Sequence, residues 1–237
     1  HRVPYKNDME DPEALICKAK EVGAKLIYLA NPDNPMGTVH PSSVISKMID
    51  SVPDDCLLIL DEAYIEFAND HVAPKINPSS SKVIRMRTFS KGYGLAGARI
   101  GYGIGHPDLI KSFDKVRNHF GMNRVSQIGA LEALLDKKHL QNTRDLVQMS
   151  RDEITRIANV NGLKPIPSAA NFVCVDCRAD GEFARKVLSE LINYGIFVRM
   201  PFVSPQDRAI RISCGTEKDL KLLEKILPKA LTAVSTG

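Results

Sequence analysis

The stretch that decides the fold is Thr88–Arg99, TFSKGYGLAGAR. It begins inside the strand-like run KVIRMRTFS at 82–90 and leads into a second strand-like run, ARIGYGIG, at 98–105. Its three glycines match the GxGxxG pattern of dinucleotide-binding loops, but that pattern needs a helix directly after the glycines. Because a strand-like run follows instead, we expect the glycines to let the backbone pass close to bulky groups beside Lys91.

Two further buried strands are predicted on the N-terminal side of this stretch. They are AKLIYLANP at 24–32 and CLLILDEAY at 56–64, and the helix-like segment PSSVISKMIDSV at 41–52 separates them. Continuous apolar strands that alternate with helices are typical of a mainly parallel sheet covered on both faces. The sequence therefore predicts an α/β fold with a three-layer α/β/α large domain at 1–142.

A smaller α+β domain is predicted at 143–237. On its N-terminal side, apolar residues at helical spacing predict helices at 107–120 and 124–140. The smaller domain itself begins with a long polar helix at about 143–160. The later segments are NFVCVDC (171–177), a helix near 181–194, the strand-like GIFVRM (195–200), AIRISCG (209–215) and an amphipathic C-terminal helix after 216.

Composition and charge limit the classes of function. The 237 residues are 43% hydrophobic and 25% charged, as in ordinary soluble globular proteins. We find no apolar run of about 18 residues and no signal peptide, so we expect a cytoplasmic protein without a membrane partner. The net charge of +4 is dispersed, which predicts no nucleic-acid partner but favours anionic small molecules.

The cysteines and histidines give little support to metal or redox chemistry. Cys174 and Cys177 form a CxxC, but inside a strand-like segment, whereas a redox pair needs a helix N-terminus and a zinc site needs a second ligand pair. The six histidines are scattered. We expect no metal site, and redox chemistry stays a minor alternative.

Polar residues gather where the predicted strands end, which is where open parallel sheets bind their ligands. Lys91 is a solvated loop lysine in the simplest interpretation. Beside a cation such as Arg99 it would instead be a nucleophilic amine. Asp61 could hold a protonated pyridine nitrogen, Tyr64 could donate to a phenolate oxygen, and Arg99 could bind a phosphate. Together these groups describe a pyridoxal phosphate site.

Four motifs make this interpretation specific. NPDNPMGT (31–38), DEAYIEF (61–67), RTFSKGYGLAGARIGY (87–102) and RISCGT (211–216), in this order and spacing, resemble the fold-type I aminotransferases. The histidinol-phosphate aminotransferase-like group is the most similar branch. The resemblance covers nearly the whole chain, and it implies pyridoxal 5'-phosphate as the cofactor.

The resemblance also implies a role for each matching residue. Lys91 would form the Schiff base, with Asp61 on the pyridine nitrogen. The phenolic oxygen would be bound by Tyr64 and Asn34, and the phosphate side by Thr88, Ser90 and Arg99. On the substrate side, Arg211 would grip a carboxylate or phosphate, beside Arg199 and Asn171. Three of these residues could instead have no role in binding. Thr88 could be a strand-end hydroxyl, Arg199 a surface arginine and Asn171 a turn cap. Glu62 is expected to be structural, because neighbouring side chains on a strand point to opposite faces.

The implied activity is transfer of an amino group between an amino acid or histidinol phosphate and a 2-oxo acid such as 2-oxoglutarate. The family also implies a homodimer. An amino-acid-phosphate decarboxylase, or a non-catalytic sensor with an aminotransferase-like domain, are the alternatives.

The sequence departs from the family in two places. Members are usually longer at the N-terminus, so we expect the first sheet strands to be missing, together with phosphate-binding and ring-stacking residues. RNHFGMNRVSQ (117–127) differs from the proline-containing version of the histidinol-phosphate enzymes, which weakens the substrate assignment.

Overall fold

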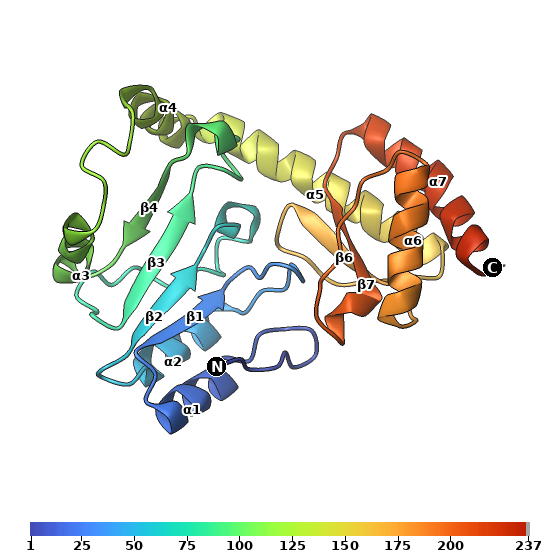
Figure 1. The fold of residues 1–237 in the computed structure, drawn as a ribbon. Helices are drawn as coiled ribbons and strands as arrows, with labels where there is room; N and C mark the ends of the chain where they lie inside the picture. Colours follow the sequence, from blue (N-terminus) through green and yellow to red (C-terminus); the bar gives the residue numbers. More distant parts are fainter. Residues whose placement is uncertain (236–237) are drawn as a thin grey trace. The chain divides into compact units, whose positions relative to one another are not determined.

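The computed structural model describes residues 1–235, which form two compact units (Figure 1). The first unit consists of His1–Asp33 and Val39–Thr143. The second consists of Asn34–Thr38 and the chain from Arg144 onward. A short piece of the N-terminal sequence therefore belongs to the C-terminal unit.

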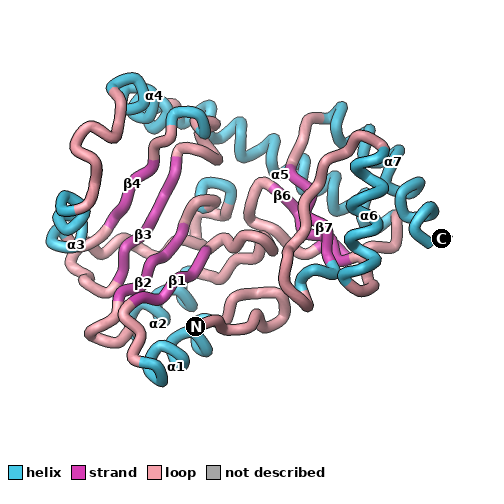
Figure 2. The backbone as a smooth tube through the Cα atoms, in the orientation of Figure 1, coloured by secondary structure: helices cyan, strands magenta, loops and turns pink. Residues whose placement is uncertain are grey.

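The first unit is built on a four-stranded sheet in the order β1-β2-β3-β4, visible as neighbouring magenta segments in Figure 2. Its strands are β1 (Leu26–Ala30), β2 (Leu57–Asp61), β3 (Val83–Thr88) and β4 (Gly101–Ile104). The first three run parallel, and β4 is antiparallel to β3. The prediction of an α/β fold with a mainly parallel sheet is confirmed.

Two helices pack on one face of this sheet, α1 (Pro12–Val22) and α2 (Ser42–Ser51). The side chain of Asp11 starts α1 by accepting hydrogen bonds from two backbone N–H groups of the first turn. The buried core between the helices and the sheet includes Leu29, Ile45, Leu58 and Leu60. Side chains alternate along a strand, so the other face of β1 carries the outward residues, among them Tyr28 at 54% exposure.

The helices after β4 are shorter or divided differently than predicted. The prediction of a helix over 107–120 is wrong for the residues after Lys115. Here α3 (Pro107–Ser112) is followed by a 3₁₀ turn, η3 (Phe113–Lys115), where the helical structure ends. The helix expected at 124–140 ends as α4 (Arg124–Leu135). Asp136 accepts a hydrogen bond from the backbone N–H of His139 and so starts a new helix, α5 (Lys137–Val160).

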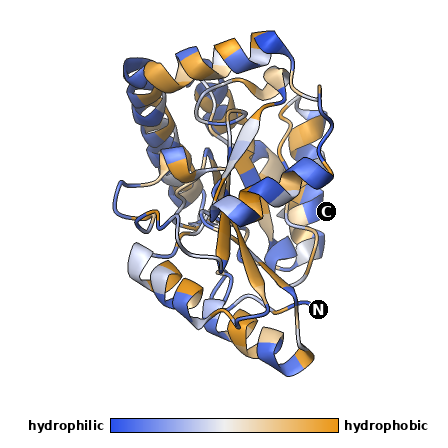
Figure 3. Cartoon of the chain, turned by 90° about the vertical axis from the view of Figure 1, so that its left-hand side faces the viewer, coloured by the Kyte–Doolittle hydropathy of each residue, from blue (hydrophilic) through white to orange (hydrophobic). Residues whose placement is uncertain are grey.

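The second unit has an antiparallel sheet in the order β5-β6-β7. Its elements are β5 (Lys164–Pro165), β6 (Phe172–Asp176), β7 (Ala209–Ser213), α6 (Gly181–Asn193) and α7 (Glu217–Ser235), with α5 contributing to the core. The predicted strand at 195–200 is wrong, because only Arg199 makes a β-bridge there. Hydrophilic and hydrophobic residues alternate along the helices, as amphipathic helices require (Figure 3). No helix in the described part of the chain is both long and apolar enough to cross a membrane.

Candidate active site

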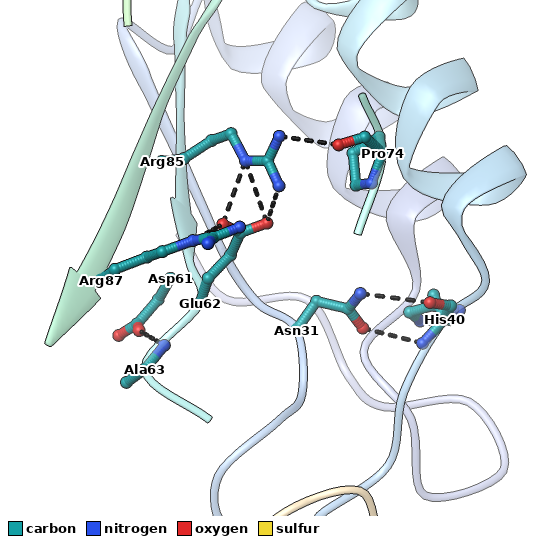
Figure 4. A network of polar contacts seen from close by, with 8 residues as sticks. All are labelled: Asn31, His40, Asp61, Glu62, Ala63, Pro74, Arg85 and Arg87. Atoms are coloured by element: carbon teal, nitrogen blue, oxygen red, sulfur yellow. Dashed lines mark hydrogen bonds and ion pairs between the residues drawn. The ribbon is translucent and has the colours of Figure 1, made fainter. Parts of the chain in front are cut away.

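Asp61 is the last residue of β2, and both oxygens of its carboxylate are held in place. Oδ1 accepts a hydrogen bond of 2.9 Å from the backbone N–H of Ala63 (Figure 4). Oδ2 accepts one of 2.7 Å from the hydroxyl of Tyr28 on the neighbouring strand. Because a carboxylate has about four lone-pair sites, it can still accept a further hydrogen bond.

Glu62, the next residue, has a different environment. Its side chain is 1% exposed and accepts hydrogen bonds from Arg85, at 2.6 Å from Nη2, and from Arg87, at 2.8 Å from Nε. In Figure 4 it reaches up to both guanidinium groups, whereas the carboxylate of Asp61 points away from them. This agrees with the structural role expected for Glu62.

Lys91 and Tyr64 lie together in the first unit. The ammonium nitrogen of Lys91 is 5.3 Å from the centre of the Tyr64 ring, within the range of a cation–π contact. Lys91 begins a tight turn that Gly94 closes with a backbone hydrogen bond of 3.0 Å to its carbonyl, at a left-handed φ of 72°. The lysine is half-buried rather than solvated on an open loop.

Thr88, Ser90 and Arg99 lie around the same end of β3. The Ser90 N–H donates to the Thr88 hydroxyl at 3.0 Å. The ladder between β3 and β4 continues past their ends through Phe89 N–H and the Ile100 carbonyl, at 3.1 Å, so Arg99 returns beside this strand end. Arg99 also has a left-handed φ of 52°, a conformation that is uncommon for non-glycine residues and concentrates at functional sites.

In the second unit, the backbones of Arg199 and Arg211 pair directly, with N···O distances of 3.1 and 2.6 Å. Residues that face each other in an antiparallel bridge point their side chains to the same side, where two like charges destabilise the pair. An anion bound between them would remove that cost. The guanidinium carbon of Arg211 lies 4.8 Å from the centre of the Phe172 ring, which keeps it in place.

Asn34 belongs to this second unit, and its side-chain oxygen accepts a hydrogen bond from Nη1 of Arg211. The segment around it is fixed by a 2.8 Å bond from the Ala169 N–H to the Gly37 carbonyl. Asn171 is half-buried, and its backbone carbonyl accepts from the Cys214 N–H at 2.9 Å. The predicted roles of the Asn34 and Asn171 side chains stay predictions.

The CxxC pair is buried in the second unit. Cys174 is fully buried and Cys177 is 5% exposed. Burial raises the pKa of the Cys177 thiol to about 12. A thiol that stays protonated at neutral pH is a poor nucleophile and a poor metal ligand, which argues against redox or metal chemistry here.

Two residues near the site were missed by the sequence reasoning. One is Tyr28, whose contact with Asp61 depends on the register between β1 and β2. The other is Glu66, in the 3₁₀ turn η1 (Ile65–Phe67), which is 9% exposed. Neither of its carboxyl oxygens has a hydrogen-bond partner among the described residues. A charged residue inside the apolar run YIEF was the available signal.

The pH dependence of stability should report on Glu66. Burial raises its pKa from 4.5 to about 7, while the charges of Arg87 and Glu62 act in opposite directions. Between these two pH values the folded state binds more protons than the unfolded state, so the free energy of unfolding falls as pH rises, by about 2–3 kcal/mol. In Glu66→Gln this loss should be absent.

Denaturant unfolding of both proteins at pH 5 and pH 8 measures this effect. Glu10, whose pKa is raised to about 8 by burial, contributes equally to both proteins and cancels in the comparison. Glu21→Gln, at an exposed position, is the matched control and should keep the wild-type pH dependence. An equal pH dependence in Glu66→Gln and wild type would contradict a neutral, buried Glu66.

The glycines of the 88–99 stretch do different things. No helix opens on them: the 3₁₀ turn η2 (Ala96–Ala98) and then β4 follow, so the dinucleotide interpretation is wrong. A Cβ on Gly92 would lie 2.8 Å from the Cβ of Glu66, whereas one on Gly97 would meet nothing within 4 Å. Close backbone approach beside Lys91 is thus confirmed at Gly92.

Alanine substitutions should separate the two glycines. Gly92→Ala is expected to lower the free energy of unfolding by about 1–3 kcal/mol, because Glu66 must move. Gly97→Ala should be neutral or stabilising by up to about 1 kcal/mol, since it only restricts the unfolded chain. Denaturant unfolding of both variants checks this, and equal effects would show that the contact with Glu66 is unimportant.

The chain is similar to known proteins. The family model described as aminotransferase class I and II matches residues 1–226. Histidinol-phosphate aminotransferase 1 of Nitrosococcus oceani is 38% identical over 234 residues, covering 96% of this chain and 62% of that protein. The aromatic amino acid aminotransferase of Mycobacterium avium is 34% identical over 217 residues, covering 90% and 59%.

The solved structures agree with the sequence comparison. The crystal structure of histidinol-phosphate aminotransferase from Sinorhizobium meliloti, in complex with pyridoxal-5'-phosphate, matches with a TM-score of 0.95 at 45% identity. The match covers 98% of this chain and 64% of that one. The chain thus spans about three fifths of the length of these relatives. The ordered motifs, the mainly parallel sheet and these matches lead to one conclusion: the chain belongs to the class I and II aminotransferase family.

Proposed function

We propose that the protein is a pyridoxal phosphate-dependent aminotransferase. It transfers an amino group between an amino acid or histidinol phosphate and a 2-oxo acid such as 2-oxoglutarate. One observation carries the proposal: a lysine, a tyrosine and an oriented carboxylate, Lys91, Tyr64 and Asp61, lie at the carboxyl ends of neighbouring parallel strands in one unit.

The donor set of the first unit fits the chemical groups of this cofactor. Asp61 offers an oriented carboxylate for the pyridine nitrogen. Tyr64 offers a phenol for the ring oxygen, and Lys91 an amine for the aldehyde. The phosphate would be held by the hydroxyls of Thr88 and Ser90 and the cation of Arg99. When bound, the cofactor supplies a sink for the electrons released at the substrate's Cα.

The protein residues then move and hold protons. Lys91, once its amine is free, removes the proton from the substrate's Cα as a general base, a contribution of about 10²–10⁴-fold. Asp61 keeps a proton on the pyridine nitrogen by accepting its hydrogen bond. The Tyr64 ring, 5.3 Å from the Lys91 nitrogen, keeps the lysine beside the site, where it can give the proton back.

The second unit supplies recognition of an anionic substrate in this proposal. Arg199 and Arg211 form a pair of cations on one side of a β-bridge, and Asn34 orients Arg211. Such a pair suits the carboxylate shared by amino and 2-oxo acids, or the phosphate of histidinol phosphate. The named relatives act on histidinol phosphate or aromatic amino acids, so assays with both classes of amino donor identify the substrate.

We also propose a homodimer, supported by an apolar stripe on α4. Val125, Ile128 and Leu131 are 81%, 57% and 56% exposed, and Leu135 continues the stripe. Exposed apolar stripes of this kind mark interfaces. Light scattering should give twice the chain mass, and Leu131→Asp should give a monomer. A monomeric wild type would reject the dimer. The cytoplasmic location stays a prediction.

Borohydride reduction of the protein mixed with pyridoxal phosphate tests the proposed function. Peptide mass spectrometry should find the phosphopyridoxyl group on Lys91 and not on exposed lysines such as Lys47. Product analysis with amino donors should then give 2-oxo acids, whereas release of carbon dioxide would indicate a decarboxylase. Absence of the adduct on Lys91 would contradict the proposal.

A further inference from the structure

Tyr28 is placed to act on Asp61 from the neighbouring strand. In the β1–β2 register Ala30 pairs with Asp61, and Tyr28 pairs with Ile59. Residues two apart on a strand share a face, so the Tyr28 ring and the Asp61 carboxylate lie diagonally across the same face. An aromatic side chain spans such a diagonal, and the Tyr28 hydroxyl donates to Oδ2 at 2.7 Å.

The core does not account for this tyrosine. Its ring is 54% exposed, so packing contributes little to its position. The pKa of its hydroxyl is raised above the ordinary value, first by burial and then by the hydrogen bond to Asp61. The Tyr28 hydroxyl therefore keeps its proton at neutral pH and acts as a neutral hydrogen-bond donor. A neutral donor orients a carboxylate without cancelling its charge, which a lysine or arginine would do.

We infer that Tyr28 is a positioning residue, which rests on the proposed function: its hydroxyl fixes the Asp61 carboxylate in the orientation that accepts a hydrogen bond from the protonated pyridine nitrogen. The Ala63 N–H holds the other oxygen, at 2.9 Å. With both donors present, the carboxylate cannot turn about its terminal bond without losing a hydrogen bond. Without Tyr28, only the Ala63 N–H holds the carboxylate, so its plane is less restricted.

The test compares two ligands that differ at one atom. Pyridoxal phosphate and its carbon analogue, in which C–H replaces the ring nitrogen, share the aldehyde, the phenol and the phosphate. The ratio of their dissociation constants, measured by absorbance titration of the whole chain, isolates the contact of Asp61 with the ring nitrogen. Wild type should prefer pyridoxal phosphate. Tyr28→Phe should reduce that preference about tenfold, the effect of one hydrogen bond to a charged group.

Two comparisons give the test its specificity. In an Asp61→Asn background, Tyr28→Phe should change the ratio by less than about twofold, because the hydrogen bond then has no charged acceptor. Tyr5→Phe is the matched control, since Tyr5 also donates to a carboxylate of the same unit, Asp33, at 2.9 Å. It should leave the ratio unchanged.

The outcomes separate the two proposals. If wild type binds pyridoxal phosphate with the expected preference but Tyr28→Phe keeps or increases the ratio, the positioning role is overturned and the proposed function stands. An increase would mean that the tyrosine weakens Asp61 as an acceptor rather than orienting it. A wild type that does not bind pyridoxal phosphate overturns both.

Discussion

Lys91→Ala is expected to lower the rate of amino-group transfer by about 10²–10⁴-fold, because the variant loses its general base. The lysine is also the covalent attachment point in the proposed mechanism, so the substrate would meet a cofactor that is held only by non-covalent contacts. The side chain is half-buried and packs near Tyr64, and its truncation removes little core. Stopped-flow or steady-state assays of 2-oxo acid formation measure the effect.

Lys47→Ala is the matched control for this variant. Lys47 is exposed, pairs with Glu13 on the surface of the same unit, and should leave the rate unchanged. A small primary amine added to Lys91→Ala should restore part of the rate, since it can take the Cα proton in place of the lysine. Activity within tenfold of wild type in Lys91→Ala would show that another group is the base.

Arg85→Met is expected to lower the free energy of unfolding by about 3–5 kcal/mol. The Arg85 and Glu62 side chains are 4% and 1% exposed, and Arg85 also donates to the Pro74 carbonyl at 2.8 Å. Removal of the arginine leaves a buried carboxylate with Arg87 as its remaining cation. Guanidinium chloride unfolding followed by circular dichroism measures the loss.

The surface pair of Lys25 and Asp55 is the control for the buried pair. Its side chains are 71% and 69% exposed, so Lys25→Met should cost less than about 1 kcal/mol. Arg85→Met combined with Glu62→Met should recover much of the stability, because no buried carboxylate remains and Arg87, at 20% exposure, still reaches solvent. A small loss in Arg85→Met alone would mean that Arg87 or water compensates fully.

The strands of the first unit were predictable from local sequence alone. Runs such as CLLIL are apolar over the length of a strand, so β2 lies inside the predicted 56–64. The same reasoning placed Asp61, Thr88 and Lys91 at strand ends, because the apolar runs stop there. Helix spacing was less reliable: 107–120 has apolar residues at helical spacing, yet Val116 and Phe120 are 82% and 94% exposed. With no core to pack against, that spacing did not extend α3.

Contacts between distant segments were not predictable. The Tyr28–Asp61 hydrogen bond requires the β1–β2 register, which a single sequence does not contain. Local rules also read Arg199 as part of a strand, although only its bridge to Arg211 forms. The burial of Glu66 depends on the backbone of Gly92, which lies 26 positions later in the numbering.

The path of residues 34–38 has a consequence for how the chain can be divided. Met36, in this segment, is fully buried within the second unit, and Gly37 is hydrogen-bonded to Ala169. A protein cut between Thr143 and Arg144 would therefore leave a C-terminal fragment without one piece of its interior and an N-terminal fragment with Met36 exposed. Neither fragment is self-sufficient, and the two should fold best when mixed. The motif that carries Asn34 makes the second unit dependent on residues synthesised more than a hundred positions earlier.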